Sequence, residues 1–248
     1  GGNKAMSRSI STALLVTSAF MLAACGSNPQ KTSSSSVEVS SLDSPEIGVV
    51  EYRPRTGTGG YRAFALGGDY ASYAATRQFV NKMVDQHGFS RSYMNGLFSE
   101  VERQDGVLEI LNRPSRKGPA RKGSWTRYRN IFMTEKRMRD GAEFMTTYRK
   151  ELNRAYQQYG VPPEYITAII GVETYYGGNI GNTPVLDALA TIAFDYPRRS
   201  KYFTSELEQF LLMTREEGFD PRSPVGSYAG AMGLGQFVPS SYREYAVD

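Results

Sequence analysis

The sequence VPPEYITAIIGVETYYGG fills residues 161–178 and predicts a helix with signals at both of its ends. Proline is tolerated in the first helical turn, and Glu164 lies where the positive end of the helix dipole favours an acid. The dipole alone explains Glu164, so we assign it no chemistry. The glycines at 177 and 178 are typical of the end of a helix.

Glu173 has the same helical spacing as the apolar residues of this predicted helix. Ile166, Ile169 and Ile170 precede it at positions i, i+3 and i+4, which predicts that its carboxyl group shares their buried face. Burial disfavours the charged form, so such an acid either keeps its proton or finds a partner. A protonated carboxyl group suits a general acid that acts on a glycosidic oxygen. A structural glutamate paired with an arginine or with backbone N–H groups is the alternative, and periodicity alone favours it.

Apolar residues with helical spacing recur upstream of this stretch. At 79–87 they predict one face of a helix that Gly88 ends, and His87 is interpreted as a residue of that helix end rather than as a catalyst. Ser90 is expected to open a second helix, and residues 134–160 predict one long helix. Strand signals are few, so the sequence predicts a mainly-α fold.

Two further helix starts are predicted downstream of Glu173. Thr183-Pro184 precedes leucines and alanines with helical spacing. Ser205 and Glu208 have the S-x-x-E spacing of a capping box, which gives Glu208 a structural role at the start of a helix.

The composition of the 248 residues excludes several classes of protein. With 40% hydrophobic and 22% charged residues, the chain is neither collagen-like nor wholly disordered. One cysteine and one histidine cannot build a disulfide framework or a zinc site of clustered His and Cys. The sequence contains no phosphate-binding loop and no dinucleotide fingerprint, which disfavours nucleotide chemistry.

The N-terminus predicts export. Lys4 and Arg8 precede an apolar run at 12–24 that is too short to span a bilayer and matches the core of a signal peptide. The segment LAACGS at 22–27 resembles a bacterial lipobox, in which Cys25 becomes the lipidated first residue. Ordinary signal-peptide cleavage beside an incidental thiol is the alternative.

These features predict the organisation of the first 62 residues. Residues 1–25 are expected to be a lipoprotein signal peptide, and the Ser-, Gly- and Pro-rich residues 26–62 a disordered tether. Gly26 after the cysteine favours an anchor in the inner leaflet of the outer membrane, so we expect the protein in the periplasm. Export argues against nucleic acid as a partner, despite the net charge of +4.

A strongly basic run lies between Arg113 and Arg139, with ten lysines and arginines against one acid. A solvated loop is the usual fate of such a run. Trp125, Tyr128 and Phe132 interleave with the charges, and aromatic rings beside arginines also bind anionic polymers, membrane surfaces or sugars. The sequence leaves the solvated loop and the ligand contact equally open.

A glycine-rich segment follows further along the chain. Four glycines at 226–235 precede Gln236 and permit close approach of another helix or of an extended ligand. Arg198 and Arg199 follow Pro197, a pattern that is often only surface.

Several long segments resemble the lytic murein transglycosylase B family. They are YGVPPEYITAIIGVETYYG (159–177), VLDALATIAFDYPRRSKYF (185–203), SELEQFLLM (205–213), GSYAGAMGLGQFVPSSYREYAVD (226–248), SWTRYRNIF (124–132) and QFVNKMVDQHGF (78–89). The resemblance implies a lysozyme-like helical core at 159–248 with an additional N-terminal helical domain, 63–158, wrapped around it.

The resemblance also implies roles for single residues. Glu173 matches the family's one catalytic acid and base. The positions that match residues of the substrate cleft are Tyr128, Arg198, Arg199, Ser227 and Gln236.

The reaction that the resemblance implies is cleavage of the β-1,4 bond between N-acetylmuramic acid and N-acetylglucosamine in peptidoglycan without water. Glu173 would protonate the leaving oxygen and then take the proton of the muramic C6 hydroxyl, which closes onto C1. Because this nucleophile is tethered, its effective molarity is high. We expect no cofactor in the chemistry, and a monomer that binds glycan strands.

Asp248 would be the first position of a calcium loop that the family carries downstream. Calcium needs six to eight oxygen ligands, so one aspartate cannot hold it. We therefore expect a core that is incomplete at its C-terminus. A hydrolase of the lysozyme type and a non-catalytic peptidoglycan-binding lipoprotein remain as alternatives.

Overall fold

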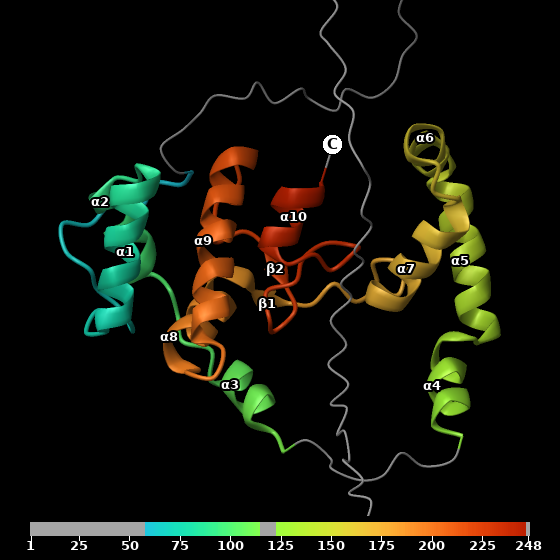
Figure 1. Cartoon of the computed structure of the whole chain (residues 1–248), viewed down its shortest axis with the longest axis horizontal. Coiled ribbons are helices and arrows are strands. Elements are labelled where there is room, and N and C mark those ends of the chain that lie inside the picture. Colours follow the sequence, from blue (N-terminus) through green and yellow to red (C-terminus); the bar gives the residue numbers. More distant parts are fainter. Residues whose placement is uncertain (1–57, 115–122, 247–248) are drawn as a thin grey trace, which may run out of the picture. The chain divides into compact units, whose positions relative to one another are not determined.

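The computed structural model describes residues 58–114 and 123–246. The predicted signal peptide, Cys25, most of the tether and Asp248 lie outside these residues. The described part is mainly helical, with two short strands, and confirms the mainly-α prediction (Figure 1). Its elements are α1 (Ala74–His87), α2 (Arg91–Ser99), α3 (Asp105–Asn112), α4 (Ser124–Phe132), α5 (Glu135–Thr147), α6 (Arg149–Tyr159), α7 (Pro163–Thr174), β1 (Thr183–Pro184), α8 (Val185–Asp195), α9 (Ser200–Glu217), β2 (Val225–Gly226) and α10 (Pro239–Tyr245).

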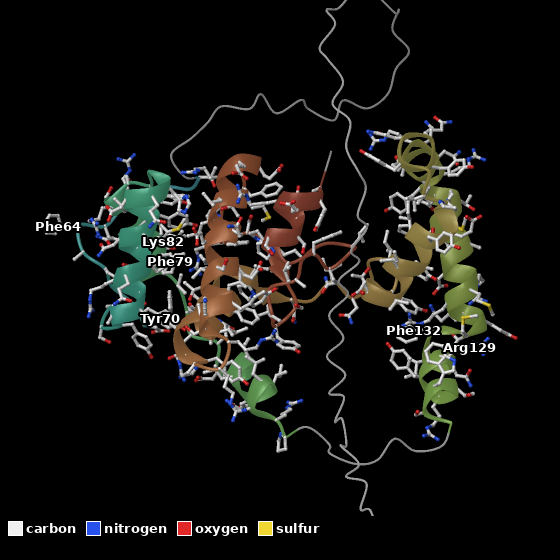
Figure 2. All side chains as sticks on the ribbon, in the orientation of Figure 1. Phe64, Tyr70, Phe79, Lys82, Arg129 and Phe132 are labelled. Carbon is white, nitrogen blue, oxygen red and sulfur yellow. The ribbon has the colours of Figure 1, made fainter. Side chains whose placement is uncertain are left out.

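The hydrophobic core joins helices from both ends of the described chain. Every residue of α8 from Val185 to Ala193 is buried, and α8 packs along α9. Side chains of α1, α2 and α3 complete the same core. Figure 2 shows Phe79 and Lys82 of α1 on the side that faces α9. Burial of a helix on all sides agrees with the apolar composition of α8, which contains three alanines and two leucines.

The helices α5, α6 and α7 pack against one another and bury few apolar side chains of their own. Phe144 of α5 and Leu152 of α6 are the large buried ones among them. No residue of the neighbouring helix α4 is buried. The predicted division of the chain after residue 158 stays a prediction.

Local signals placed the first helices correctly. α1 ends at His87, and Gly88 follows in the left-handed conformation that glycine adopts without strain. Ser90 caps α2, because its hydroxyl oxygen accepts a hydrogen bond from the backbone N–H of Tyr93 at 3.2 Å. The end of the predicted tether is ordered at Tyr61, whose hydroxyl donates to Asp220 at 2.7 Å.

Two helix predictions were wrong. The long helix expected at 134–160 is divided at Tyr148 into α5 and α6. The capping box at Ser205 is also wrong, since α9 begins at Ser200 and places Ser205 inside the helix. Glu208 is structural for another reason. It is buried and accepts hydrogen bonds from Lys82 at 2.5 Å and His87 at 2.7 Å.

Candidate active site around Glu173

Glu173 is the penultimate residue of α7, and its side chain is exposed. The expectation of a buried stripe through this residue was wrong, because the buried residues of α7 are Thr167, Gly171 and Thr174, whereas Ile169 is 57% exposed. Among the described residues, Glu173 forms no hydrogen bond and no ion pair. The carboxyl group is therefore open to a ligand, and no cation of the described residues holds it.

The side chain of Tyr176 explains which face of α7 is buried. A Cβ added to Gly171 would lie 2.7 Å from the Tyr176 ring, and one added to Gly141 of α5 would lie 2.6 Å from its hydroxyl oxygen. The same hydroxyl donates a hydrogen bond to the carbonyl oxygen of Arg137 at 3.0 Å. Tyr176 thus fills the space between α5 and α7, and this face holds Gly171 instead of the isoleucines.

Backbone strain is concentrated around Glu173. In residues 58–114 and 123–246, the non-glycine residues with positive φ are Tyr175 (53°), Tyr176 (58°) and Gln236 (51°). Such conformations cost about 1–3 kcal/mol each and persist only where the surrounding structure enforces them. Two of them directly follow the helix end that carries Glu173, and the third is a predicted cleft residue. This distribution points to a functional site.

Hydrogen bonds join the end of α7 to the glycine-rich segment 226–236. The Thr174 hydroxyl shares its hydrogen between the carbonyl oxygens of Leu234 and Ile170, each at 3.1 Å. The Gln236 amide donates to the carbonyl oxygen of Ile180 at 3.2 Å. The structure therefore brings the segment of Gln236 against the two ends of the turn that follows Glu173.

The predicted cleft residue Ser227 lies where the same two segments approach most closely. A Cβ on Gly181 would be 2.1 Å from the carbonyl oxygen of Gly226, so only glycine fits there. The Ser227 hydroxyl oxygen accepts hydrogen bonds from the N–H groups of Ala229 at 3.3 Å and Ala231 at 3.0 Å. Ser227 orders the glycine-rich turn, and in the described chain its side chain does not bond to Glu173.

Residues of α5 hold Tyr175, the residue after Thr174. The Tyr175 hydroxyl donates to Asp140 at 2.7 Å and accepts a hydrogen bond from Lys136 at 2.8 Å. The Arg137 guanidinium lies 4.4 Å from the centre of the Tyr175 ring. The hydrogen bonds from Lys136 and Tyr175 hold the pKa of the Asp140 carboxyl below its ordinary value. We call these four residues the Tyr175 corner.

Tyr128 belongs to a row of rings on α4, the α4 aromatic row, which consists of Trp125, Tyr128 and Phe132. The Tyr128 ring centre lies 6.2 Å from that of Trp125 and 5.2 Å from that of Phe132. Tyr128 is 54% exposed and Trp125 is 69% exposed, so their faces are open to solvent. Figure 2 labels Phe132 and Arg129 on this helix. Part of the basic run is therefore a helix that carries exposed rings, rather than a loop.

Arg198 and Arg199 occupy the turn between α8 and α9, and both are exposed. The Arg199 guanidinium lies 5.5 Å from the ring centre of Tyr202 and 5.7 Å from that of Phe203. In the described part of the chain, no hydrogen bond joins either arginine to Glu173, Ser227 or Gln236. Their assignment to the same cleft stays a prediction.

A family model described as a transglycosylase SLT domain matches residues 71–248. The chain belongs to this family. The match confirms the resemblance and places α1 to α10 in a transglycosylase SLT domain.

The relatives of this transglycosylase SLT domain are lytic transglycosylases. The chain is 45% identical over 233 residues to membrane-bound lytic murein transglycosylase B of Escherichia coli (strain K12), covering 92% of this chain and 62% of that protein. The E. coli lytic transglycosylase Slt35 in complex with bulgecin A has a TM-score of 0.68 and 50% identity, over 74% of this chain and 58% of that one. A structure of Slt35 in complex with calcium gives the same TM-score at 49% identity, over 74% and 57% of the two chains.

A more distant relative is SltB3 from Pseudomonas aeruginosa, solved in complex with NAG-anhNAM-pentapeptide. Its TM-score is 0.59 at 28% identity, over 71% of this chain and 44% of that one. The chain thus spans about three fifths of the length of the first two relatives. The shared fold with these lysozyme-like enzymes confirms the predicted fold class.

The described residues show neither a cluster of metal ligands nor a membrane-spanning helix. Within 58–114 and 123–246, no three His, Cys, Asp or Glu side chains come together in a way that could hold a metal ion. Asp248, the predicted first position of a calcium loop, lies outside the described residues, so that prediction stays untested. No described helix is both long enough and apolar enough to cross a bilayer.

The sequence did not reveal the Tyr175 corner. Tyrosine has no preference for the left-handed conformation, so nothing in YYGG marked Tyr175 and Tyr176 as the first residues to adopt it. Lys136, Arg137 and Asp140 sat within a charged run that is typical of a solvated surface. Only the packing of α5 against α7 brings these side chains to the two tyrosines.

Proposed function

We propose that this chain is the catalytic part of a lytic transglycosylase that cleaves the glycan strands of peptidoglycan. The observation that carries the proposal is the position of Glu173, an exposed carboxyl group without a described partner at a strained helix end. Membership of the transglycosylase SLT domain family and the similarity to lytic murein transglycosylase B support this assignment.

The reaction proposed is non-hydrolytic and uses one acid. Glu173 protonates the oxygen of the β-1,4 bond between N-acetylmuramic acid and N-acetylglucosamine, while the substrate N-acetyl group stabilises the developing cation. The Glu173 carboxylate then removes the proton of the C6 hydroxyl, whose oxygen closes onto C1 and gives a 1,6-anhydromuramyl end. The anhydro sugar bound to SltB3 is consistent with such a product.

Asp140 contacts Tyr175, which lies two positions after Glu173, and we assign its carboxyl group no catalytic role. A retaining hydrolase needs a second carboxylate as nucleophile, and an inverting one needs it as a base for water. Asp140 lies at the Tyr175 corner, where it accepts hydrogen bonds from Lys136 at 2.7 Å and Tyr175 at 2.7 Å. Both bonds end on its Oδ2 and help to hold α5 against the end of α7, so we propose a structural role for Asp140.

The remaining predicted site residues are proposed to bind the glycan strand. Exposed rings such as Tyr128 pack on sugar faces, and the exposed arginines 198 and 199 can pair with the lactyl carboxylate or the peptide stem. Gln236 and Ser227 are proposed to shape the cleft beside Glu173, because they order the segment that lies against it. The chemistry uses no cofactor, and no step passes through calcium.

We further propose where the protein acts. The signal sequence and the lipobox at Cys25 direct it to the periplasm, where a lipid holds it in the inner leaflet of the outer membrane. The relative from E. coli is called membrane-bound, which agrees with an anchor. In this arrangement a monomer reaches the glycan strands, and nucleic acid is not a partner.

The decisive experiment compares the full chain with its Glu173→Gln variant on purified peptidoglycan, with products analysed by mass spectrometry. We expect anhydromuramyl products from the unchanged protein and a loss of about a hundredfold or more in the variant. Glu164→Gln is the matched control, because Glu164 lies exposed on the first turn of the same helix. It should release products at the unchanged rate.

The products also separate the alternatives. A hydrolase of the lysozyme type would leave reducing ends, which are one water heavier than the anhydro product. A non-catalytic binding lipoprotein would sediment with peptidoglycan and release nothing, whatever residue stands at 173. Either result would overturn the proposal.

A further inference from the structure

The guanidinium group of Arg137 contacts two aromatic rings that belong to different parts of the candidate site. Its central carbon is 5.3 Å from the ring centre of Phe132, the last ring of the α4 aromatic row, and 4.4 Å from that of Tyr175. A planar cation stacks well on aromatic faces and keeps its N–H groups free for hydrogen bonds at its edge. Arg137 thus connects the ring next to Tyr128 with the residue two positions after Glu173.

The same group also bonds to the helix that carries Glu173. Arg137 donates a hydrogen bond from Nη1 to the carbonyl oxygen of Gly171 at 2.8 Å. Gly171 lies in the last turn of α7, where carbonyl oxygens lack helical partners and the helix dipole favours a cation. The backbone of Arg137 contributes as well, since its carbonyl oxygen accepts the hydrogen bond from Tyr176.

We propose that Arg137 is a positioning residue that fixes the Glu173 end of α7 relative to the α4 aromatic row. This inference rests on the proposed function. Arg137 touches no reacting atom; it acts through Gly171, Tyr175 and Phe132. Loss of Arg137 should leave Glu173 and Tyr128 on their own helices. Their position relative to each other would no longer be fixed. Such a change lowers the rate of the bound complex more than it weakens substrate binding.

The test uses the full chain and soluble glycan strands, with kcat and KM measured separately. Arg137→Ala is expected to lower kcat about tenfold, as for one lost hydrogen bond to a charged group, while KM changes little. The matched control is Arg149→Ala, because Arg149 is an exposed arginine at the start of α6. The control should keep the unchanged kcat and KM.

Chemical rescue separates positioning from a general loss of stability. The Arg137→Ala variant has a gap between two rings that free guanidinium ions can fill. At about 10 mM, far below the molar concentrations that unfold proteins, guanidinium chloride should restore much of the kcat, and sodium chloride should not. If the variant lost activity only because it unfolds, guanidinium at this concentration would not restore the kcat, and the inference would be wrong.

Arg137→Lys covers the case in which the alanine variant does not fold. Lysine keeps the charge but lacks the planar fork, so we expect a folded protein with a kcat several-fold below that of the unchanged chain. An unchanged kcat in Arg137→Lys would overturn the inference. Failure of the proposed function looks different, because Glu173→Gln would then be as active as the unchanged chain.

Discussion

The Thr174 hydroxyl lies 3.1 Å from the carbonyl oxygen of Leu234, 60 positions along the sequence, and shares its hydrogen between this oxygen and that of Ile170, also at 3.1 Å. The hydroxyl oxygen also accepts a hydrogen bond from the N–H of Gly177 at 3.1 Å. Thr174 is 1% exposed, so water does not replace these bonds. The residue next to the candidate acid is therefore what fastens α7 to the glycine-rich segment.

Thr174→Val should destabilise the protein, because it removes these bonds and keeps the shape of the side chain. We expect the free energy of unfolding to fall by about 1–2 kcal/mol, measured by denaturant titration. Thr167→Val is the matched control. Thr167 is buried on the same face of α7, and its hydroxyl has no hydrogen-bond partner in the described chain. Its replacement should leave the stability unchanged or raise it, and equal losses in both variants would refute the argument.

Gly171→Ala should also destabilise the protein, because the added Cβ would lie 2.7 Å from the Tyr176 ring. Overpacking of this kind costs about 1–3 kcal/mol. The control is Gly106→Ala in α3, where a Cβ would meet no atom within 4 Å. Alanine favours a helix, so this variant should gain up to about 1 kcal/mol. The melting temperatures of the two variants should therefore move in opposite directions.

The stability of the Tyr175 corner should depend on pH. The pKa of Asp140 is lowered by its hydrogen bonds with Lys136 and Tyr175, so the stability that it contributes is present above its ordinary pKa of about 3.9. That contribution is lost as the pH falls through the lower value of the folded state. The unfolding free energies of the unchanged protein and Asp140→Asn should therefore differ at about pH 6 and converge towards about pH 2.

Asp85→Asn serves as the control for this experiment, because Asp85 is an exposed aspartate of α1. Its variant should follow the unchanged protein across the whole range. A difference for Asp140→Asn that stayed constant down to the lowest pH would show that the ion pair with Lys136 contributes nothing.

Glu208→Gln should weaken the attachment of α9 to α1. Although burial raises the pKa of Glu208, the hydrogen bonds from Lys82 and His87 lower it below its ordinary value. Loss of the charged acceptor should reduce the free energy of unfolding by about 1–3 kcal/mol at neutral pH. The stability of both variants is measured by thermal unfolding. Glu109 of α3 is exposed, so the control Glu109→Gln should not change it. Glycan release should persist in both variants at temperatures where they stay folded.

The sequence predicted what depends on neighbouring residues. The end of α1 at Gly88 and the cap at Ser90 follow from local spacing and from side chains that bond to their own helix. The position of Glu173 near the end of a helix followed from the same kind of signal. In each case the deciding interaction spans only a few residues.

What depends on distant residues was not predictable. The buried face of α7 is set by Tyr176 between Gly141 and Gly171, and no periodicity within α7 contains that information. The sequence does contain the capping-box spacing at Ser205. However, α9 begins five residues earlier, at Ser200, so Ser205 lies inside the helix and cannot cap it. Residues of the Tyr175 corner lie about forty positions apart, and only the packing of α5 on α7 reveals their contact.

The uneven burial of the chain has a consequence for its hydrogen exchange. Amide protons of α8, which is buried along nearly its whole length, should exchange only when the molecule unfolds globally. In α4 to α7 the large buried side chains are Phe144 and Leu152, so these helices should open locally and exchange much sooner. The proposed acid Glu173 thus lies on α7, in the part of the described chain that is expected to open first, whereas α8, the most protected helix, carries none of the proposed site residues.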